Sequence, residues 1–338
     1  MRRPRLASWL GVAVSLVSLA AVAWWIARQD PPRLPGSGVG FAWLALALLL
    51  SSCTLALRGR RWHRILRLAG VPHRPRDAYG LTLVAYMGNN VLPARGGELL
   101  KIGLLGQRSS ARRREILGTV VAERLLDAVV LAALFAAFTW TGVDGTPSGR
   151  GGAAVAGAIL LGAGCTLALY LQLRRRGRFE RFARTVRPVA RASKLFAQPH
   201  GIPLALASLL IWFLEGVTFL VIARALEIEL DVLAGVAVVA IASLFAAIPA
   251  APGYAGTFDA GLIVGLHAAG VKGGDAVAVL LLARFMLFVP VTLAGLVTLV
   301  VGYRGLGGAA ADDEELLAEQ PPSERRREVA AGQRGAGR

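Results

Sequence analysis

Cysteine and histidine are scarce in this sequence, with 2 and 4 residues. Cys53 and Cys165 lie in apolar stretches, so we interpret them as small packing residues rather than as a disulfide framework or part of a metal cluster. The histidines show no metal-site spacing, and neither a P-loop nor a nucleophile elbow occurs. We therefore expect no metal, no cofactor, no ATP-hydrolysing site and no catalytic residues.

Acidic residues are also few beside the basic ones, with 21 Asp and Glu against 38 Lys and Arg, for a formal net charge of +17. On a soluble domain such an excess predicts nucleic-acid binding. Here 55% of the residues are hydrophobic, the mean hydropathy is +0.56, and the basic residues lie in short segments between apolar runs. Runs such as 41–57, 153–173 and 277–301 reach the roughly 17–25 residues that span a bilayer. The sequence therefore predicts an integral membrane protein and no nucleic-acid partner.

The distribution of arginine predicts the orientation of the spans, because Lys and Arg in short loops resist translocation. Segments 58–76, 95–114 and 174–194 are rich in Arg, so we expect all three in the cytoplasm, together with both termini. Residues 1–28 combine a basic start with an apolar run of about 20 residues, too long for a typical signal peptide. We interpret them as a retained first helix.

Two apolar stretches do not fit a simple alternation of spans. The stretch 79–92 has basic segments on both sides and is too short to cross twice, so we expect a re-entrant hairpin broken at 89–97. In the second half, 232–248 and 257–269 flank a similar break at 249–256. The predicted fold is an all-α polytopic membrane helix bundle with about six full spans and two broken hairpins.

Each half of the chain then consists of two spans, a broken hairpin and a further span, in opposite orientations. Gly96 precedes Arg124 by 28 residues, and Gly256 precedes Arg284 by the same number. Inverted repeats with matching breaks are typical of transporters, whose substrate site lies between the breaks. We predict repeats at 8–140 and 153–302 within a domain of residues 1–303, followed by a disordered cytoplasmic tail at 304–338; a plain helix bundle is the alternative.

Polar residues inside apolar spans are the candidate functional groups, because a charge at the centre of a span costs about 2.5–3.5 kcal/mol on insertion scales. The first group, Asn90, Pro93, Arg95 and Glu98, lies at and just after the first break. Broken backbone at membrane depth is tolerated only where protein or a water-filled cavity satisfies its polar groups.

The second group is Glu123, Arg124 and Asp127, which lie about two turns into an apolar helix. Glu123 and Asp127 are four residues apart and therefore share a face. The group could form a structural ion-pair lock, or it could present Arg124 to a phosphate through a bidentate contact.

The third and fourth groups lie in the second half of the chain. Pro252, Gly253, Gly256 and Asp259 mark a break followed by a helix start, which could offer amide donors to an anion or form an ordinary extracellular turn. Arg284 lies alone in the last span and needs a carboxylate partner, for which Asp259 and Glu215 are candidates.

Three ordered motifs, at 89–98 (NNVLPARGGE), 123–127 (ERLLD) and 252–259 (PGYAGTFD), resemble the lysylphosphatidylglycerol synthase transmembrane family, also called the flippase-like domain family. The resemblance covers about residues 8–303. It implies a bacterial inner-membrane domain that moves, or helps to move, a lipid with a polar headgroup between leaflets. The best-known members also carry an aminoacyltransferase domain, and we expect no synthase activity here because about 35 residues follow Tyr303.

Three positions depart from the family pattern. Asp259 stands where the family usually has Glu, Tyr254 where it has Gly, and Lys101 where it often has Arg. The predicted substrate-binding and translocation residues are Asn90, Pro93, Arg95, Glu98, Lys101, Glu123, Arg124, Asp127, Pro252, Gly253, Gly256, Asp259 and Arg284.

Three function classes follow. The leading hypothesis is translocation of an anionic phospholipid or a polyprenyl-phosphate-linked lipid. The second is a membrane partner that delivers lipid to a separate transferase without translocating it. The third is an intramembrane enzyme acting on the headgroup, with Glu123 and Asp127 as acid and base.

Overall fold

The computed structural model describes residues 23–24, 26–32, 35–92, 95–141, 201–246 and 252–303. Within these ranges all regular secondary structure is helical, which confirms the predicted all-α class. Most of the predicted first span at 1–28, the span at 153–173 and the tail at 304–338 lie outside the described residues, as does Pro93.

The described helices fall into two sets, each with the order long, short, short, long. The first set comprises α2 (Gly38–Leu68), α3 (Pro75–Val91), α4 (Gly96–Arg108) and α5 (Arg113–Thr141). The second comprises α8 (Gly201–Ala225), α9 (Val232–Ala246), the 3₁₀ turn η2 (Pro252–Tyr254), α10 (Thr257–Ala268) and α11 (Gly273–Tyr303). In both sets a long helix precedes two short ones and a second long helix follows them.

Three of these helices, α2, α8 and α11, are long and apolar enough to cross a membrane. Their outer faces carry exposed apolar side chains such as Phe41, Leu206 and Val297, as expected of surfaces in contact with lipid. Helix α5 has 29 residues and is therefore about 43 Å long, but charged side chains interrupt its first half. The total of about six spans stays a prediction.

The first half corrects the end of one helix. The apolar run was predicted at 41–57, before the Arg-rich segment 58–76, whereas α2 continues as a helix to Leu68; the cytoplasmic location of 58–76 stays a prediction. Arg58 and Arg61 lie on its inner face and are 4% and 2% exposed, while Arg60 is exposed. These two arginines are therefore part of the helix bundle and not part of a solvated loop.

Both predicted breaks separate two helices that fold back on each other. Helix α3 packs along α4, and α9 packs along α10. At the first hairpin the two backbones approach closely: a Cβ built on Gly97 would lie 2.0 Å from the Ala85 carbonyl oxygen. The first break is shorter than the predicted 89–97, because α3 ends at Val91 and α4 begins at Gly96. Part of the predicted break at 249–256 lies outside the described residues, and the re-entrant course of both hairpins stays a prediction.

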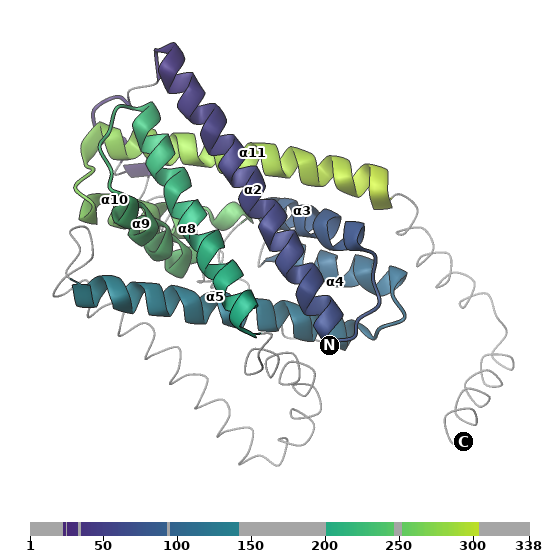
Figure 1. Cartoon of the computed structure of the whole chain (residues 1–338). Coiled ribbons are helices and arrows are strands. Elements are labelled where there is room, and N and C mark those ends of the chain that lie inside the picture. Colours follow the sequence, from purple (N-terminus) through teal and green to yellow (C-terminus); the bar gives the residue numbers. More distant parts are fainter. Residues whose placement is uncertain are drawn as a thin grey trace, which may run out of the picture.

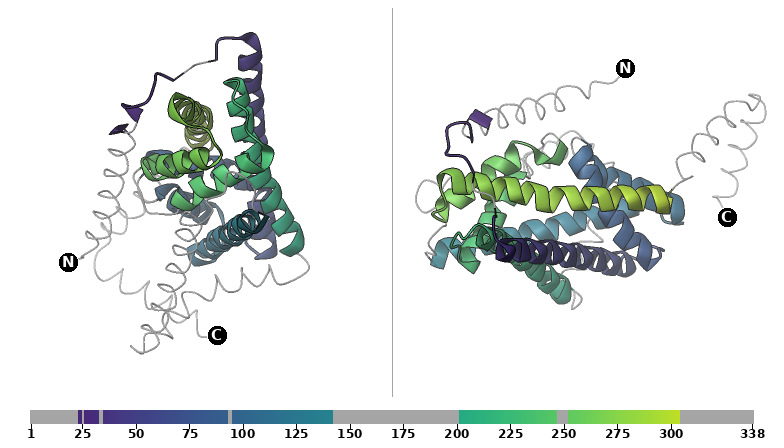
Figure 2. Two further views of the ribbon diagram at one scale, coloured as in Figure 1. Left: turned by 90° about the vertical axis from the view of Figure 1, so that its left-hand side faces the viewer. Right: turned by 90° about the horizontal axis from the view of Figure 1, so that it is seen from above.

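Contacts between the two sets hold the bundle together. Helices α2 and α8 run side by side, and α3 packs along α11 (Figure 1). Figure 2 shows the same bundle from two further sides, with α2 and α8 on one flank of the short helices. In chain order, α2, α3, α4 and α5 correspond to α8, α9, α10 and α11. With this correspondence, the contacts α3–α11, α2–α5 and α4–α5 are matched by α9–α5, α8–α11 and α10–α11. The inverted repeat at 8–140 and 153–302 agrees with this pattern and stays a prediction.

The close approach at Gly97 yields a stability prediction. We expect Gly97→Ala to lower the free energy of unfolding by about 1–3 kcal/mol, because a methyl group at this position displaces backbone atoms of α3. The matched control is Gly103→Ala in the same helix, whose added Cβ would meet nothing within 4 Å. Thermal unfolding in detergent measures both variants; equal melting temperatures would contradict the close hairpin packing.

Candidate functional site

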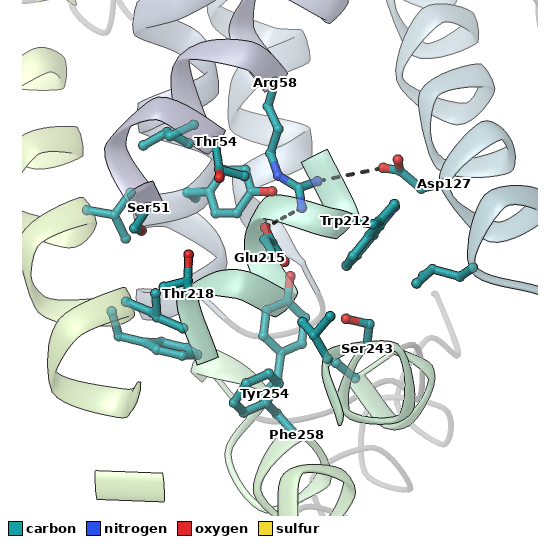
Figure 3. Close-up of a pocket in the computed structure, with 18 of the residues that line it drawn as sticks. Ser51, Thr54, Arg58, Asp127, Trp212, Glu215, Thr218, Ser243, Tyr254 and Phe258 are labelled. Atoms are coloured by element: carbon teal, nitrogen blue, oxygen red, sulfur yellow. Dashed lines mark hydrogen bonds and ion pairs between the residues drawn. The ribbon is translucent and has the colours of Figure 1, made fainter. Parts of the chain in front are cut away.

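A cavity of about 440 Å³ lies between the two sets of helices, within the range of small-molecule sites. Helices α2, α3, α5, α8, α9, α10 and α11 contribute to its wall, together with Arg95 and Tyr254 from the two breaks. Figure 3 shows Arg58 between Asp127 and Glu215 on one side of this cavity, with Tyr254 and Phe258 further along it. The polar and aromatic lining residues are Ser51, Thr54, Arg58, Tyr86, Asn90, Arg95, Arg124, Asp127, Trp212, Glu215, Thr218, Phe219, Ser243, Tyr254, Phe258 and Phe288.

Behind the wall, Arg61 of α2 binds two carboxylates of α5. Its Nη1 lies 2.5 Å from Asp127 Oδ1, and its Nη2 lies 3.0 Å from Glu123 Oε1. Nη1 also donates to the Ser208 hydroxyl of α8 at 2.5 Å. Glu123 and Asp127 are 2% and 4% exposed, so the guanidinium group of Arg61, and not solvent, stabilises their negative charges.

Two further cations extend this cluster. Lys101 of α4 lies 3.3 Å from Glu123 Oε2 and stands over the Trp62 ring at 3.7 Å. Arg58 forms an ion pair with Glu215 of α8, and its Nη1 lies 3.8 Å from Asp127 Oδ2. The guanidinium carbon of Arg58 also lies 4.9 Å from the centre of the Trp212 ring, so this cation has an aromatic contact as well as carboxylate partners.

Arg124 occupies a different position from its neighbours on α5. Its Nη2 lies 3.0 Å from Glu98 Oε1, its Nη1 lies 3.7 Å from Asp127 Oδ2, and its side chain is 33% exposed. Arg124 lines the cavity, whereas Glu123 lies behind the wall. Glu123 and Asp127 are therefore paired with Arg61, whereas Arg124 is paired and also borders the cavity; its contact with a phosphate stays a prediction.

Within this cluster the charges balance. Four cations, Arg58, Arg61, Lys101 and Arg124, are paired with four carboxylates, Glu98, Glu123, Asp127 and Glu215.

Arg95 adds a positive charge beyond that balance. Its Nη2 donates to the Ala246 carbonyl oxygen at 3.0 Å, and its guanidinium group lies 5.5 Å from the centre of the Tyr254 ring. No carboxylate of the described residues forms an ion pair with it. Arg95 and Tyr254 both have left-handed backbone, with φ of 57° and 55°, which is uncommon for side chains of this size. The two breaks thus meet at a cationic group that faces the cavity.

The second break repeats an ion pair of the first. Asp259 in the first turn of α10 binds Arg284 of α11 at 2.6 Å, as Glu98 in the first turn of α4 binds Arg124 of α5. Arg284 also donates to the Gly253 carbonyl oxygen at 2.6 Å, and the Gly256 N–H donates to Asp259 at 2.8 Å. The Gly256 amide just before α10 is therefore already engaged by a carboxylate of the same helix; whether the break serves an anion or is an ordinary turn stays open.

The predicted site residues fall into three places. Asn90, Arg95, Arg124 and Asp127 line the cavity. Glu98, Glu123 and Asp259 bind cations in or beside it, and Lys101 is one of the two cations that Glu123 binds. Pro252, Gly253 and Arg284 border an adjoining outer groove together with Asn90, and Gly256 precedes the first residue of α10.

The sequence interpretation did not identify Arg58, Arg61, Tyr86 and Trp212. The signal for the two arginines was their spacing: the buried residues Thr54, Arg58, Arg61 and Ile65 recur every three or four positions, as one face of a helix requires. In the part of the chain that the structure describes, no three side chains of the usual metal-binding types come together.

The buried cluster yields a second prediction. We expect Arg61→Gln to destabilise the protein by about 3–5 kcal/mol, because it leaves buried carboxylates short of a partner. Arg60→Gln removes the same charge from an exposed position one residue away and serves as the control. Urea unfolding in detergent micelles compares the two; equal midpoints would show that the cluster does not stabilise the bundle.

Comparisons with known proteins agree with the three sequence motifs. A family model described as the lysylphosphatidylglycerol synthase TM region matches residues 8–295. A UPF0104 membrane protein of Methanothermobacter thermautotrophicus is 26% identical over 286 residues, which cover 73% of this chain and 81% of that protein. No solved structure matches the chain. With a match over most of its length and helices long enough to span a bilayer, this membrane protein belongs to the family of the lysylphosphatidylglycerol synthase TM region.

Proposed function

We propose that the protein translocates an anionic membrane lipid, an anionic phospholipid or a polyprenyl-phosphate-linked lipid, and that the cavity holds its headgroup. The observation that carries the proposal is Arg95, whose charge faces the cavity and has no carboxylate partner among the described residues. An anion beside Arg95 would complete the charge balance of the site. The family, named for a lipid synthase, supports a role connected with membrane lipids.

Arg124 supplies a second point of contact. Its Nε is buried and has no hydrogen-bond partner in the described part of the chain, and its side chain lines the same cavity as Arg95. A phosphate group can accept two parallel hydrogen bonds from one guanidinium group. Arg95 and Arg124 therefore have N–H donors that the described part of the protein does not use and that a phosphate could accept.

The position of the cavity favours transport over simple binding. Its wall includes residues of both breaks and of long helices from both sets. In transporters with matching broken helices, alternating access exposes such a central site to either side of the membrane. The sequence has no nucleotide-binding motif, so we propose that exchange follows the lipid gradient or an ion gradient, in a bacterial inner membrane with both termini in the cytoplasm.

The burial of Glu123 and Asp127 disfavours the enzyme hypothesis. Both carboxylates are engaged by Arg61, and an acid or base that is locked in ion pairs is poorly placed to exchange a proton with a substrate. The second candidate, a lipid-delivering partner of a transferase, predicts headgroup binding without exchange between leaflets.

Exchange in proteoliposomes tests the proposal. We expect the protein to accelerate exchange of fluorescent phosphatidylglycerol or of a polyprenyl phosphate, and Arg95→Gln to slow it about tenfold. The physical reason is the loss of a charge-assisted hydrogen bond worth about 1.5–3 kcal/mol. Arg95→Lys keeps the charge but not the planar fork, so its rate should lie between the two.

The control for this experiment is Arg60→Gln, which changes an exposed residue of α2 and should exchange lipid like the wild type. Binding of both probes without exchange in the folded wild type would favour the transferase-partner hypothesis. Equal rates for wild type and Arg95→Gln would refute the assignment of Arg95.

A further inference from the structure

A groove of about 610 Å³ lies on the outer side of α11, next to the cavity. Four apolar residues form its length, at intervals of four positions along the helix: Leu281, Phe285, Val289 and Leu293. Their side chains are 45%, 58%, 41% and 58% exposed. Residues four apart share one face of a helix, so the groove has a continuous apolar wall.

The groove and the cavity share part of their lining. Asn90 and Phe288 border both. Asn90 Nδ2 donates to the Thr292 hydroxyl at 2.9 Å, and Arg284 lies 4.3 Å from the centre of the Phe288 ring. One aromatic ring and one hydrogen-bonded pair therefore stand between the headgroup site and the outer surface.

We propose that this groove binds a hydrocarbon chain of the lipid whose headgroup occupies the cavity, with Phe288 and the Asn90–Thr292 pair as the gate between them. The inference rests on the proposed function and adds to it the path of the chain. A lipid that crosses the bilayer through a polar cavity needs a lateral opening, because its chains are more stable in the apolar phase.

The dimensions and chemistry of the groove fit this occupant. From Leu281 to Leu293 the helix rises about 18 Å, slightly more than half of the roughly 30 Å hydrocarbon core of a bilayer. Arg284 is the charged residue of the groove, and Asp259 already neutralises it. The wall of α11 thus offers apolar contact to a chain, on a helix long enough to cross a membrane.

Photo-labelling tests the groove directly. The full-length protein is reconstituted with phosphatidylglycerol that carries a diazirine in one acyl chain, and labelled peptides are mapped by mass spectrometry. We expect residues 285–293 to be labelled about fivefold more strongly than the exposed lipid-facing residues Leu206, Leu210 and Phe213 of α8. Excess unlabelled phosphatidylglycerol should displace the groove label and leave the α8 label unchanged.

Matched variants separate groove binding from general contact with lipid. Leu293→Trp fills the groove and should reduce its label about threefold. Val297→Trp adds the same ring one turn further along α11, at a residue that is 61% exposed and outside the groove, and should leave the label unchanged. Equal labelling of α11 and α8 without displacement would overturn the proposal, as would peptide–peptide cross-links showing a second copy of the chain in the groove.

Leaflet exchange measured in the same liposomes keeps the two proposals apart. Displaceable groove labelling without exchange would support the chain site and refute translocation. Exchange without displaceable labelling would support translocation and refute the groove.

Discussion

A guanidinium group enclosed in an apolar helix bundle is stable only where carboxylates lie beside it. Arg61 meets this condition with Glu123 and Asp127 of α5, and the same two carboxylates draw in Lys101 of α4 and Arg58 of α2. Arg58 in turn binds Glu215 of α8. Four helices are therefore fixed to one another by charge as well as by packing, and three of them, α2, α5 and α8, line the cavity.

The four cations and four carboxylates of this cluster have no net charge. The cluster therefore joins the helices around the cavity and adds no net charge to it. The charge of the cavity comes from Arg95, which the first break presents in a left-handed backbone conformation opposite Tyr254 of the second break. Strained residues of this kind persist where the surrounding structure holds them, and they are concentrated at functional sites. The cavity thus combines a rigid wall of paired charges with an unpaired cation at the meeting point of the two breaks.

The sequence predicts the membrane class, two helical hairpins and four of the residues that line the cavity, Asn90, Arg95, Arg124 and Asp127. It does so because apolar runs, Gly and Pro breaks and charges inside spans have direct physical meanings. It also offered Asp259 as a partner for Arg284, and the structure confirms this pair. It did not identify Arg58 and Arg61 as buried residues of α2, because a dense run of arginines resembles a solvated segment by composition alone. It did not name the pair Glu98–Arg124, which the packing of α4 against α5 brings together.

The central claim is that an anionic lipid headgroup occupies the cavity between the two breaks, and accessibility of the cavity to a thiol reagent tests it most directly. Ser243 lines the cavity from α9, and Ser243→Cys can be placed in a background with Cys53→Ser and Cys165→Ser. The account predicts that a water-soluble maleimide labels Ser243→Cys in the folded protein and that anionic phospholipid, but not zwitterionic phospholipid, slows the labelling. Equal labelling rates with both lipids would contradict a site selective for anionic headgroups.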